Sequence, residues 1–338
     1  MKIGLNLIMK DEEKVLPRLL ESVYPLLDYY TIVDTGSTDK SKQIVKDFFS
    51  AKNIPGEIFD APFTNFSETR NIAISKIASE VDYALIIDSD EQLILSKEFN
   101  IKDFKERIAP FDTANIVVEQ GTTKYSRAAI FKVSKNFYWK GKVHNALVCD
   151  TKANQTYISE EVKIKVNTDG NTWTKQSTME KYSKQAEILE EEVKKYNRPR
   201  DIFYLAQCYK DASNNEQALK WYANRLTRKD GFYEELYYSQ FMIGNIYKEL
   251  GLGELAIFEW MKCNELDELR GEHLVNIIIE LQAKAMFKTA LKLSEEGLEK
   301  YYHKNPYPNR VLFLHSPTYQ EKFKELHEIN QAKIKAWK

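Results

Sequence analysis

The hydrophobic period of the chain changes once, near Gln176, and this change divides the sequence into two parts of different fold. Up to about residue 170, short apolar blocks alternate with charged stretches of helical period. Beyond Gln176, long helical stretches rich in Leu, Ala, Glu, Lys and Tyr follow one another with almost no strand signal. A length of 338 residues also favours two domains. We therefore expect one domain at 1–172 and a second at 173–338.

The first part is predicted to form an α/β fold on a parallel sheet, because strands and helices alternate along it. Several apolar blocks lack alternation, which indicates strands buried on both faces. The expected strands are Ile3–Met9, Tyr30–Val33, Glu57–Phe59, Tyr83–Ile87, Asn115–Val118, Ala129–Val133 and Val162–Val166, and the expected helices are Glu12–Ser22, Ser37–Ser50 and Ser67–Ser79. Ligands of such sheets bind beyond the carboxyl ends of the strands.

The second part carries a weak internal repeat. Ala218, Ala256 and Ala290 recur at spacings close to the roughly 34-residue period of tetratricopeptide repeats. Small residues allow paired helices to approach closely, so we expect three helix pairs at about 201–302, after a charged helix at about 176–196. This arrangement predicts a short all-α solenoid. The chain has only 12 glycines, which suits a largely helical fold.

Composition excludes several classes of protein. With 49 Lys and Arg against 50 Asp and Glu, the net charge of −1 gives no basic surface for non-specific binding of nucleic acid. The three cysteines, Cys149, Cys208 and Cys263, are odd in number and widely spaced, which argues against a disulfide framework or a zinc site. The apolar run at the start is shorter than that of a signal peptide, and no stretch approaches about 18 apolar residues, so we expect neither a signal peptide nor a membrane helix. We expect a cytoplasmic protein with no membrane span.

The strongest chemical signal is the Asp-x-Asp pattern of Asp88 and Asp90, directly after a buried strand. Residues i and i+2 of an extended backbone lie on the same face, so both carboxylates are expected to converge on one ligand while Ser89 points away. Mg²⁺ and Mn²⁺ prefer such oxygen ligands, combined with substrate phosphates. An isolated Asp-x-Asp is typical of a solvated turn, but its position after a buried strand favours a functional site.

Two further positions carry charge near expected strand or helix ends. Asp34 ends the strand at 30–33, and Ser37 is expected to cap the next helix, with Asp39 in its first turn. Helix capping by Ser37 does not explain why Asp34 lies at the carboxyl end of a strand, where such sheets bind ligands. Arg70 falls early in a helix, where a surface charge is the alternative interpretation.

Four segments, in this order and spacing, resemble the successive motifs of family 2 glycosyltransferases of the GT-A (Rossmann-like) fold. They are Asn6–Glu13, Ile32–Asp39, Phe66–Asn71 and Asp88–Asp90. The resemblance implies a nucleotide-diphosphate sugar as donor, most often a UDP-sugar. It implies binding of the nucleotide sugar by Asp34, Arg70, Asp88 and Glu12, and binding of Mn²⁺ or Mg²⁺ by Asp90, with Asp88 contacting the metal or the ribose.

The segment Tyr138–Asn145 is similar to the Gly-x-Val-His-Glu segment of a subgroup with C-terminal tetratricopeptide-like helices. Glycosyltransferases of phages and large viruses have this architecture, as does, more distantly, the S-glycosyltransferase that modifies sublancin. His144 is then expected to contact the metal or the diphosphate and to take part in catalysis. The alternative is a polar residue that packs beside Trp139.

The chain departs from this subgroup at two positions. Asn145 stands where relatives usually carry Glu, and Thr168 lies in the segment where they often have a second His. If that Glu is the general base, Asn145 cannot replace it, since an amide does not accept a proton near neutral pH. Either another carboxylate such as Glu119 acts as the base, or the acceptor needs little activation, or the protein is weakly active or inactive.

These observations predict a metal-dependent glycosyltransferase of the hexosyltransferase class, with UDP-glucose or a similar donor and inversion at the anomeric carbon. The acceptor is open: a peptide or protein, a glycan or another small molecule. The alternative is an inactive nucleotide-sugar-binding scaffold whose repeats hold a protein partner. Nucleotidyl transfer would require a glycine-rich loop after the first strand, where acidic Lys10–Glu13 stands instead.

The helical part could bind the acceptor, form a homodimer contact or cap the catalytic domain. Its aromatic residues recur at helical spacing, which is more typical of core packing than of sugar binding; they include Trp221, Tyr237, Tyr238 and Trp260. Tyr319–Lys338 is expected to be a terminal charged helix with a solvated face.

Overall fold

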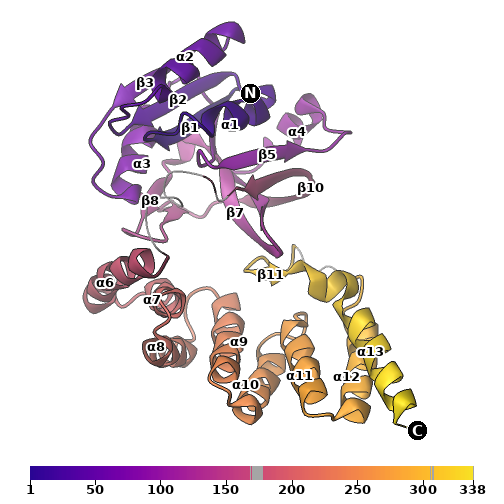
Figure 1. Ribbon diagram of the computed structural model, residues 1–338. Helices are drawn as coiled ribbons and strands as arrows, with labels where there is room; N and C mark the ends of the chain where they lie inside the picture. Colours follow the sequence, from indigo (N-terminus) through magenta and orange to yellow (C-terminus); the bar gives the residue numbers. More distant parts are fainter. Residues whose placement is uncertain (168, 170–177, 305, 307, 338) are drawn as a thin grey trace. The chain divides into compact units, whose positions relative to one another are not determined.

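The computed structural model describes residues 1–167, 169, 178–304, 306 and 308–337, and the chain divides into two compact units (Figure 1). The first unit comprises Met1–Gly121 and Tyr125–Ser177, and the second comprises Thr122–Lys124 and Thr178–Lys338. An α/β unit is thus followed by an all-α unit, and the predicted order of fold classes is confirmed.

The first unit is built on a sheet with the strand order β3-β2-β1-β4-β7-β6-β10-β5. The strands on one side of it are β3 (Gly56–Asp60), β2 (Tyr29–Asp34), β1 (Ile3–Met9) and β4 (Tyr83–Ile86). They are parallel, and their register pairs Met9 with Asp34 and Asn6 with Ile86. The carboxyl ends of β1, β2 and β4 therefore lie along one edge of the sheet, where the sequence places its motifs.

The sheet is mixed beyond β4, so the prediction of a wholly parallel sheet is wrong there. The remaining strands are β5 (Glu91–Leu95), β6 (Thr113–Gln120), β7 (Thr123–Lys132) and β10 (Gln155–Val166). β7 is antiparallel to β4, and β5 is antiparallel to β10, whereas β10 and β6 are parallel. The physical reason lies in the short connection between β6 and β7, because a parallel crossover needs a dozen or more residues.

Helices α1 (Leu16–Val23), α2 (Ser41–Ala51) and α3 (Phe66–Ser75) occupy predicted helical regions. α1 buries Leu16, Leu19, Leu20 and Val23, an i, i+3, i+4, i+7 face in the same hydrophobic cluster as β1. The sequence analysis did not anticipate β5, α4 (Ile101–Ile108) or the two-stranded ribbon of β8 (Tyr138–Lys140) and β9 (Ala146–Val148). Short 3₁₀ turns at Tyr24–Leu26 and Val133–Lys135 complete the described elements.

The second unit is a solenoid of helices (Figure 1). They are α6 (Thr178–Tyr196), α7 (Pro199–Asp211), α8 (Asn215–Thr227), α9 (Glu234–Glu249), α10 (Gly253–Leu266), α11 (Glu272–Ala283), α12 (Phe287–Lys300) and α13 (Phe323–Ala336). Ala218, Ala256 and Ala290 are fully buried, as predicted for close contacts. A π-helical turn at Thr318–Lys322 precedes α13.

Buried ion pairs hold the segment between α12 and α13 in the second unit. Arg270 donates to the carbonyl oxygens of Leu312 (2.7 Å) and Phe313 (3.1 Å) and pairs with Glu272. Glu272 also accepts from the hydroxyl of Tyr319 (2.8 Å). The strand β11 (Leu314–His315) follows and pairs with Thr123 and Lys124, which group with this unit. These charges are buried with partners, as burial of charge requires.

The aromatic residues of the repeats serve the core, as expected from their spacing. Tyr237 and Trp260 are buried, and Trp221 and Tyr238 are partly buried against a cluster around Phe203. Among the described helices none is both long and apolar enough to cross a membrane.

Gly244 on α9 provides a test of close helix packing. A Cβ at this position would lie 2.4 Å from Trp260 Cδ1, which is sterically impossible without movement of the ring. We expect Gly244→Ala to lower the free energy of unfolding: overpacking costs about 1–3 kcal/mol, which exceeds the gain of about 1 kcal/mol in helix propensity. Chemical unfolding measures this. In a Trp260→Ala background the same change should be neutral or stabilising, and an equal loss there would contradict the packing argument.

Candidate functional site

The loops that follow β1 and β2 are joined to each other by hydrogen bonds. Asp11, in a left-handed conformation (φ 53°), accepts from the amide of Thr38 (2.7 Å) and donates its own amide to the hydroxyl of Ser37 (2.9 Å). The amide of Glu12 donates to the hydroxyl of Ser41 (2.8 Å). The backbone of Glu12, a predicted donor-binding residue, is therefore fixed at the carboxyl edge of the sheet.

Asp34 organises the second of these loops. Its carboxylate is fully buried; it accepts from the amides of Gly36 (3.2 Å) and Ser37 (3.0 Å) and from the hydroxyl of Ser37, and it pairs with Lys42 (3.3 Å). Gly36 has φ 99°, a conformation that favours glycine. The helix α2 begins at Ser41, so the prediction that Ser37 caps it is wrong: the hydroxyl of Ser37 is bonded to Asp34 and Asp11 instead.

Arg70 joins three of the sequence motifs. From α3 it donates to Asp88 Oδ1 (2.6 Å) and to Asn145 Oδ1 (2.8 Å). Its guanidinium carbon lies 4.8 Å from the ring centre of Trp139 and 5.6 Å from that of Phe66. Only 15% of the side chain is exposed, so the alternative interpretation of Arg70 as a surface charge is wrong. The motif segments at 66–71, 88–90 and 138–145 therefore meet at one guanidinium.

The turn from Asp88 to Glu91 differs from the expected extended backbone. β4 ends at Ile86, and the amide of Glu91 donates to the carbonyl oxygen of Asp88 (3.0 Å), which closes a turn. Ser89 is buried, and the argument that placed Asp88 and Asp90 on one strand face does not hold. Asp90 is half-buried, and its carbonyl oxygen accepts from the amide of Asn167 (3.0 Å).

Glu91 and Arg127 belong to this cluster and were missed by the sequence analysis. Glu91 is 3% exposed, and its Oε2 accepts from the amide of Asp88 (2.8 Å) and from Arg127 Nη2. Arg127 comes from β7, and its Nη1 lies 3.8 Å from Asp88 Oδ2. A glutamate directly after Asp-x-Asp was the signal available in the sequence, whereas nothing in the strand pattern distinguished Arg127.

The pKa values of Asp88 and Glu91 are shifted in opposite directions. Burial raises the pKa of Glu91 to about 7, although the charge of Arg127 acts in the opposite direction. Burial also acts to raise the pKa of Asp88, but the charges of Arg70 and Arg127 outweigh it and hold that pKa below its usual value. Asp88 is thus an ionised carboxylate between two guanidinium groups at neutral pH.

The ribbon of β8 and β9 carries His144 and Asn145 and is anchored to α3. Asn71 donates to the carbonyl oxygen of Trp139 (2.9 Å) and accepts from its amide (2.7 Å). His144, with φ 45°, is half-buried in the loop between the two strands. Its neighbour Asn145 accepts from Arg70, so the loop is held beside the Arg70 and Asp88 pair.

The remaining predicted positions lie on other elements. Glu119 is half-buried on β6 and pairs with Lys163 of β10 (3.4 Å). Thr168 lies outside the described residues. Its neighbour Asp169 makes a bidentate pair with Arg18 of α1 (2.7 Å for both hydrogen bonds), and the positive charge of Arg18 also interacts with Asp90.

The described residues contain no group of three or more His, Cys, Asp and Glu side chains arranged to hold a metal ion. Asp88 is a poor ligand, because its two oxygens face Arg70 and Arg127. Asp90 is the better candidate, since a divalent cation can be bound by one carboxylate together with phosphate oxygens of a substrate. The chemistry of the residues present therefore fits a metal shared between Asp90 and a diphosphate.

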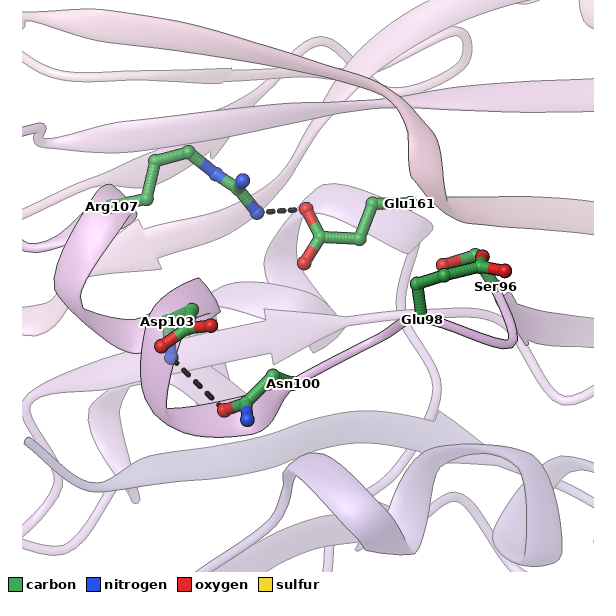
Figure 2. A pocket seen from close by; sticks show the side chains of 6 residues that line it. All are labelled: Ser96, Glu98, Asn100, Asp103, Arg107 and Glu161. Atoms are coloured by element: carbon green, nitrogen blue, oxygen red, sulfur yellow. Dashed lines mark hydrogen bonds and ion pairs between the residues drawn. The ribbon is translucent and has the colours of Figure 1, made fainter.

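A solvent-open hollow of about 400 Å³ lies elsewhere in the first unit (Figure 2). Its lining residues are Ser96, Glu98, Asn100, Asp103, Arg107 and Glu161. Arg107 pairs with Glu161, and Asn100 caps α4 by accepting from the amide of Asp103 (3.2 Å). None of the predicted site residues lines this hollow, so its arginine and carboxylates are suited to serve as controls for those of the site.

Comparison with known proteins identifies the first unit. Residues 7–99 match the profile of Glycosyl transferase family 2. Over these residues, which are less than half of the chain, the first unit is similar to Glycosyl transferase family 2. The match begins within β1 and includes every residue of the four motif segments except Asn6. The second unit is a tetratricopeptide-like solenoid of helices.

A relative among curated proteins is a TPR repeat-containing protein of Synechococcus elongatus, 33% identical over 129 residues. The match covers 37% of this chain and 30% of the relative, so the chain spans less than a third of that protein's length.

Solved structures resemble the chain only distantly. S. aureus TarS 1–349, in complex with UDP-GlcNAc, is 13% identical with a TM-score of 0.35, over 93% of this chain and 97% of that one. The C-terminal part of a TPR repeat-containing protein from Cytophaga hutchinsonii is 20% identical with a TM-score of 0.34, over 46% and 56% of the two chains. These likenesses are too distant to bear on ligands.

Asn71 offers a test of how the ribbon is positioned. We expect Asn71→Ala to lower the free energy of unfolding by about 1–3 kcal/mol and to speed amide exchange at Trp139, because two hydrogen bonds to its backbone are lost. Asn71→Asp keeps the acceptor and should show a smaller loss. Unchanged exchange at Trp139 in Asn71→Ala would contradict the anchoring role.

Proposed function

We propose that the protein transfers a sugar from a nucleotide-diphosphate sugar, UDP-glucose or a similar UDP-sugar, to an acceptor. The observation that carries this proposal is the meeting of three motif segments at Arg70, in a domain of a glycosyltransferase family and at the carboxyl edge of its sheet. This edge is where α/β sheets bind nucleotides. Transfer of a hexose such as glucose would place the enzyme in the hexosyltransferase class.

The donor would lie along this edge. The joined loops of Glu12 and Asp34 would bind the nucleoside, with Asp34 acting through the loop that it orders. Arg70 would place a positive charge toward the phosphates, and Asp88 would keep the Arg70 guanidinium in position. Aromatic faces of Phe66 and Trp139 on Arg70 restrict its rotation, which preserves this geometry before the donor binds.

Mn²⁺ or Mg²⁺ would be held by Asp90, with His144 as a further candidate, whereas the predicted ligand Asp88 is already paired with two arginines. The ion would supply a Lewis acid that offsets the negative charge on the departing diphosphate. Asp90 suits this role because it lies in the turn after β4, and its position is fixed by the hydrogen bond that its carbonyl oxygen accepts from the amide of Asn167.

Direct displacement by an acceptor would invert the anomeric carbon and would leave a proton to be removed. Asn145 accepts a hydrogen bond from Arg70 but cannot accept a proton, so it would position Arg70 without acting as the base. Glu119 is the candidate base on this chain, unless the acceptor needs little activation. His144 would contribute to diphosphate binding.

A second function is supported by Asn145 and Thr168: a nucleotide-sugar-binding scaffold with little or no turnover. The helical unit would then hold a protein partner or form a homodimer. In the enzymatic case the same unit would bind an acceptor such as a peptide, protein or glycan.

The deciding experiment is incubation of the purified protein with a panel of nucleotide sugars, with and without Mn²⁺ and with EDTA. Release of the nucleoside diphosphate from one donor, lost in EDTA, supports the metal-dependent enzyme. Binding without release under any condition, including with peptide and glycan acceptors, supports the scaffold. Absence of both binding and release contradicts both functions.

Asp90→Asn tests the metal position. An amide is a weaker ligand for a hard cation, so we expect Mn²⁺-dependent release of the nucleoside diphosphate to fall on the order of 10²-fold. Asp103→Asn, in the remote hollow of Figure 2, should leave the rate unchanged. Equal rates for Asp90→Asn and the wild type would remove Asp90 from the metal site.

Glu119→Gln tests the base. If Glu119 removes the acceptor proton, the variant should bind the donor normally and transfer its sugar on the order of 10²-fold more slowly. The dissociation constant for the nucleoside diphosphate and the transfer rate are measured on the same samples. A normal transfer rate would leave proton removal to another group or to solvent.

A further inference from the structure

Arg127 is a second guanidinium group at the candidate site, and no sequence motif accounts for it. It reaches the turn from β7, whereas Arg70 reaches it from α3. The two arginines face different oxygens of Asp88: Arg70 Nη2 is 2.6 Å from Oδ1, and Arg127 Nη1 is 3.8 Å from Oδ2. The second distance is an ion pair but too long for a hydrogen bond.

Most hydrogen-bonding capacity of Arg127 is unused among the residues that the structure describes. A guanidinium carries five N–H donors, and in the described part of the chain only Nη2 has an acceptor, which is Glu91. The Nε of Arg127 is buried without a partner, and Nη1 makes only the long ion pair with Asp88. Buried donors without acceptors are rare in folded proteins and call for an explanation.

Glu91 fixes the position of the Arg127 guanidinium, whose Nε and Nη1 have no hydrogen-bond acceptor in the described part of the chain. Glu91 is buried, pairs with Arg127 and also accepts from the amide of Asp88, so a single carboxylate fixes both the arginine and the turn. Yet 26% of the Arg127 side chain remains exposed. A cation that is held in place, partly accessible and short of acceptors is prepared for an anionic ligand.

We propose that Arg127 binds the diphosphate of the donor, with Nη1 donating to a phosphate oxygen, and that Glu91 is the residue that positions it. This inference rests on the proposed function and adds a binding residue to it. Guanidinium groups match phosphate oxygens in both charge and geometry.

The diphosphate is the part of the donor that fits this position. Asp88 is already paired with Arg70, so a phosphate oxygen would compete with it only for the weaker contact at 3.8 Å. As the sugar is displaced, the bond between the anomeric carbon and the phosphate oxygen breaks and its electron pair stays on the diphosphate. Arg127 would then stabilise a charge that grows during the reaction, in addition to binding the ground state.

The test is the affinity of Arg127→Met for uridine, UMP and UDP, measured by calorimetry. Loss of a charged hydrogen bond predicts binding of UDP weakened about 10- to 100-fold, binding of UMP weakened less, and binding of uridine unchanged. Arg107→Met removes a similar arginine–glutamate pair at the hollow of Figure 2 and should leave all three affinities unchanged. Arg127→Lys, which keeps the charge beside Glu91, should recover part of the loss.

The outcomes separate this inference from the function on which it rests. If the wild type binds neither UDP nor any UDP-sugar, the proposed function fails. If the wild type binds UDP and Arg127→Met binds uridine, UMP and UDP with the same affinities as the wild type, Arg127 is not a diphosphate ligand. An equal loss for uridine and UDP would show that Arg127 only maintains the fold. Should Arg127→Met be unfolded in a thermal melt, the comparison of Arg127→Lys with wild type decides by the same criterion.

Discussion

The site depends on one guanidinium, that of Arg70, which must find acceptors because it is largely buried. It finds them on two segments that are distant in sequence, Asp88 after β4 and Asn145 in the ribbon of β8 and β9. An arginine removed from water without such partners would be strongly destabilising. The requirement for acceptors therefore fixes both segments relative to α3, while Asn71 fixes the ribbon through Trp139.

At the carboxyl edge of the sheet, carboxylates and guanidinium groups neutralise one another in pairs, and neither sign of charge is in large excess. Asp88 and Glu91 face Arg70 and Arg127, and Asp90 lies within the field of Arg18. A chain with a net charge of −1 can thus bind an anion at a local site without a basic surface. A diphosphate would meet guanidinium groups on one side and, through a cation at Asp90, a carboxylate on the other.

Sequence reasoning succeeded where the signal was long or tied to a strand end. The buried strands β1, β2 and β4 have nearly the predicted bounds, and the motifs follow them because carboxyl ends of parallel strands share an edge. It failed at β8 and β9, which are too short to show a period, and at Asp88. β4 ends at Ile86, so Asp88 lies in a turn and not on the expected strand. Because side chains alternate between the two faces of a strand, the predicted directions of Asp88 and Asp90 hold only if the strand continues through them. Arg127 could not be found, since it precedes the predicted strand Ala129–Val133, whereas β7 begins at Thr123.

Asn145, where the resemblance leads us to expect a glutamate, would have two separable consequences for the proposed function. An amide oxygen still accepts the hydrogen bond of Arg70, so the geometry of the site survives the change. A glutamate would also have neutralised part of the charge of Arg70, whereas the amide leaves that charge to Asp88 and to a bound phosphate. Under the proposed function, binding of the donor would be preserved or strengthened at the position where proton removal from the acceptor would be lost. Activation of the acceptor would then fall to another residue or to the acceptor itself.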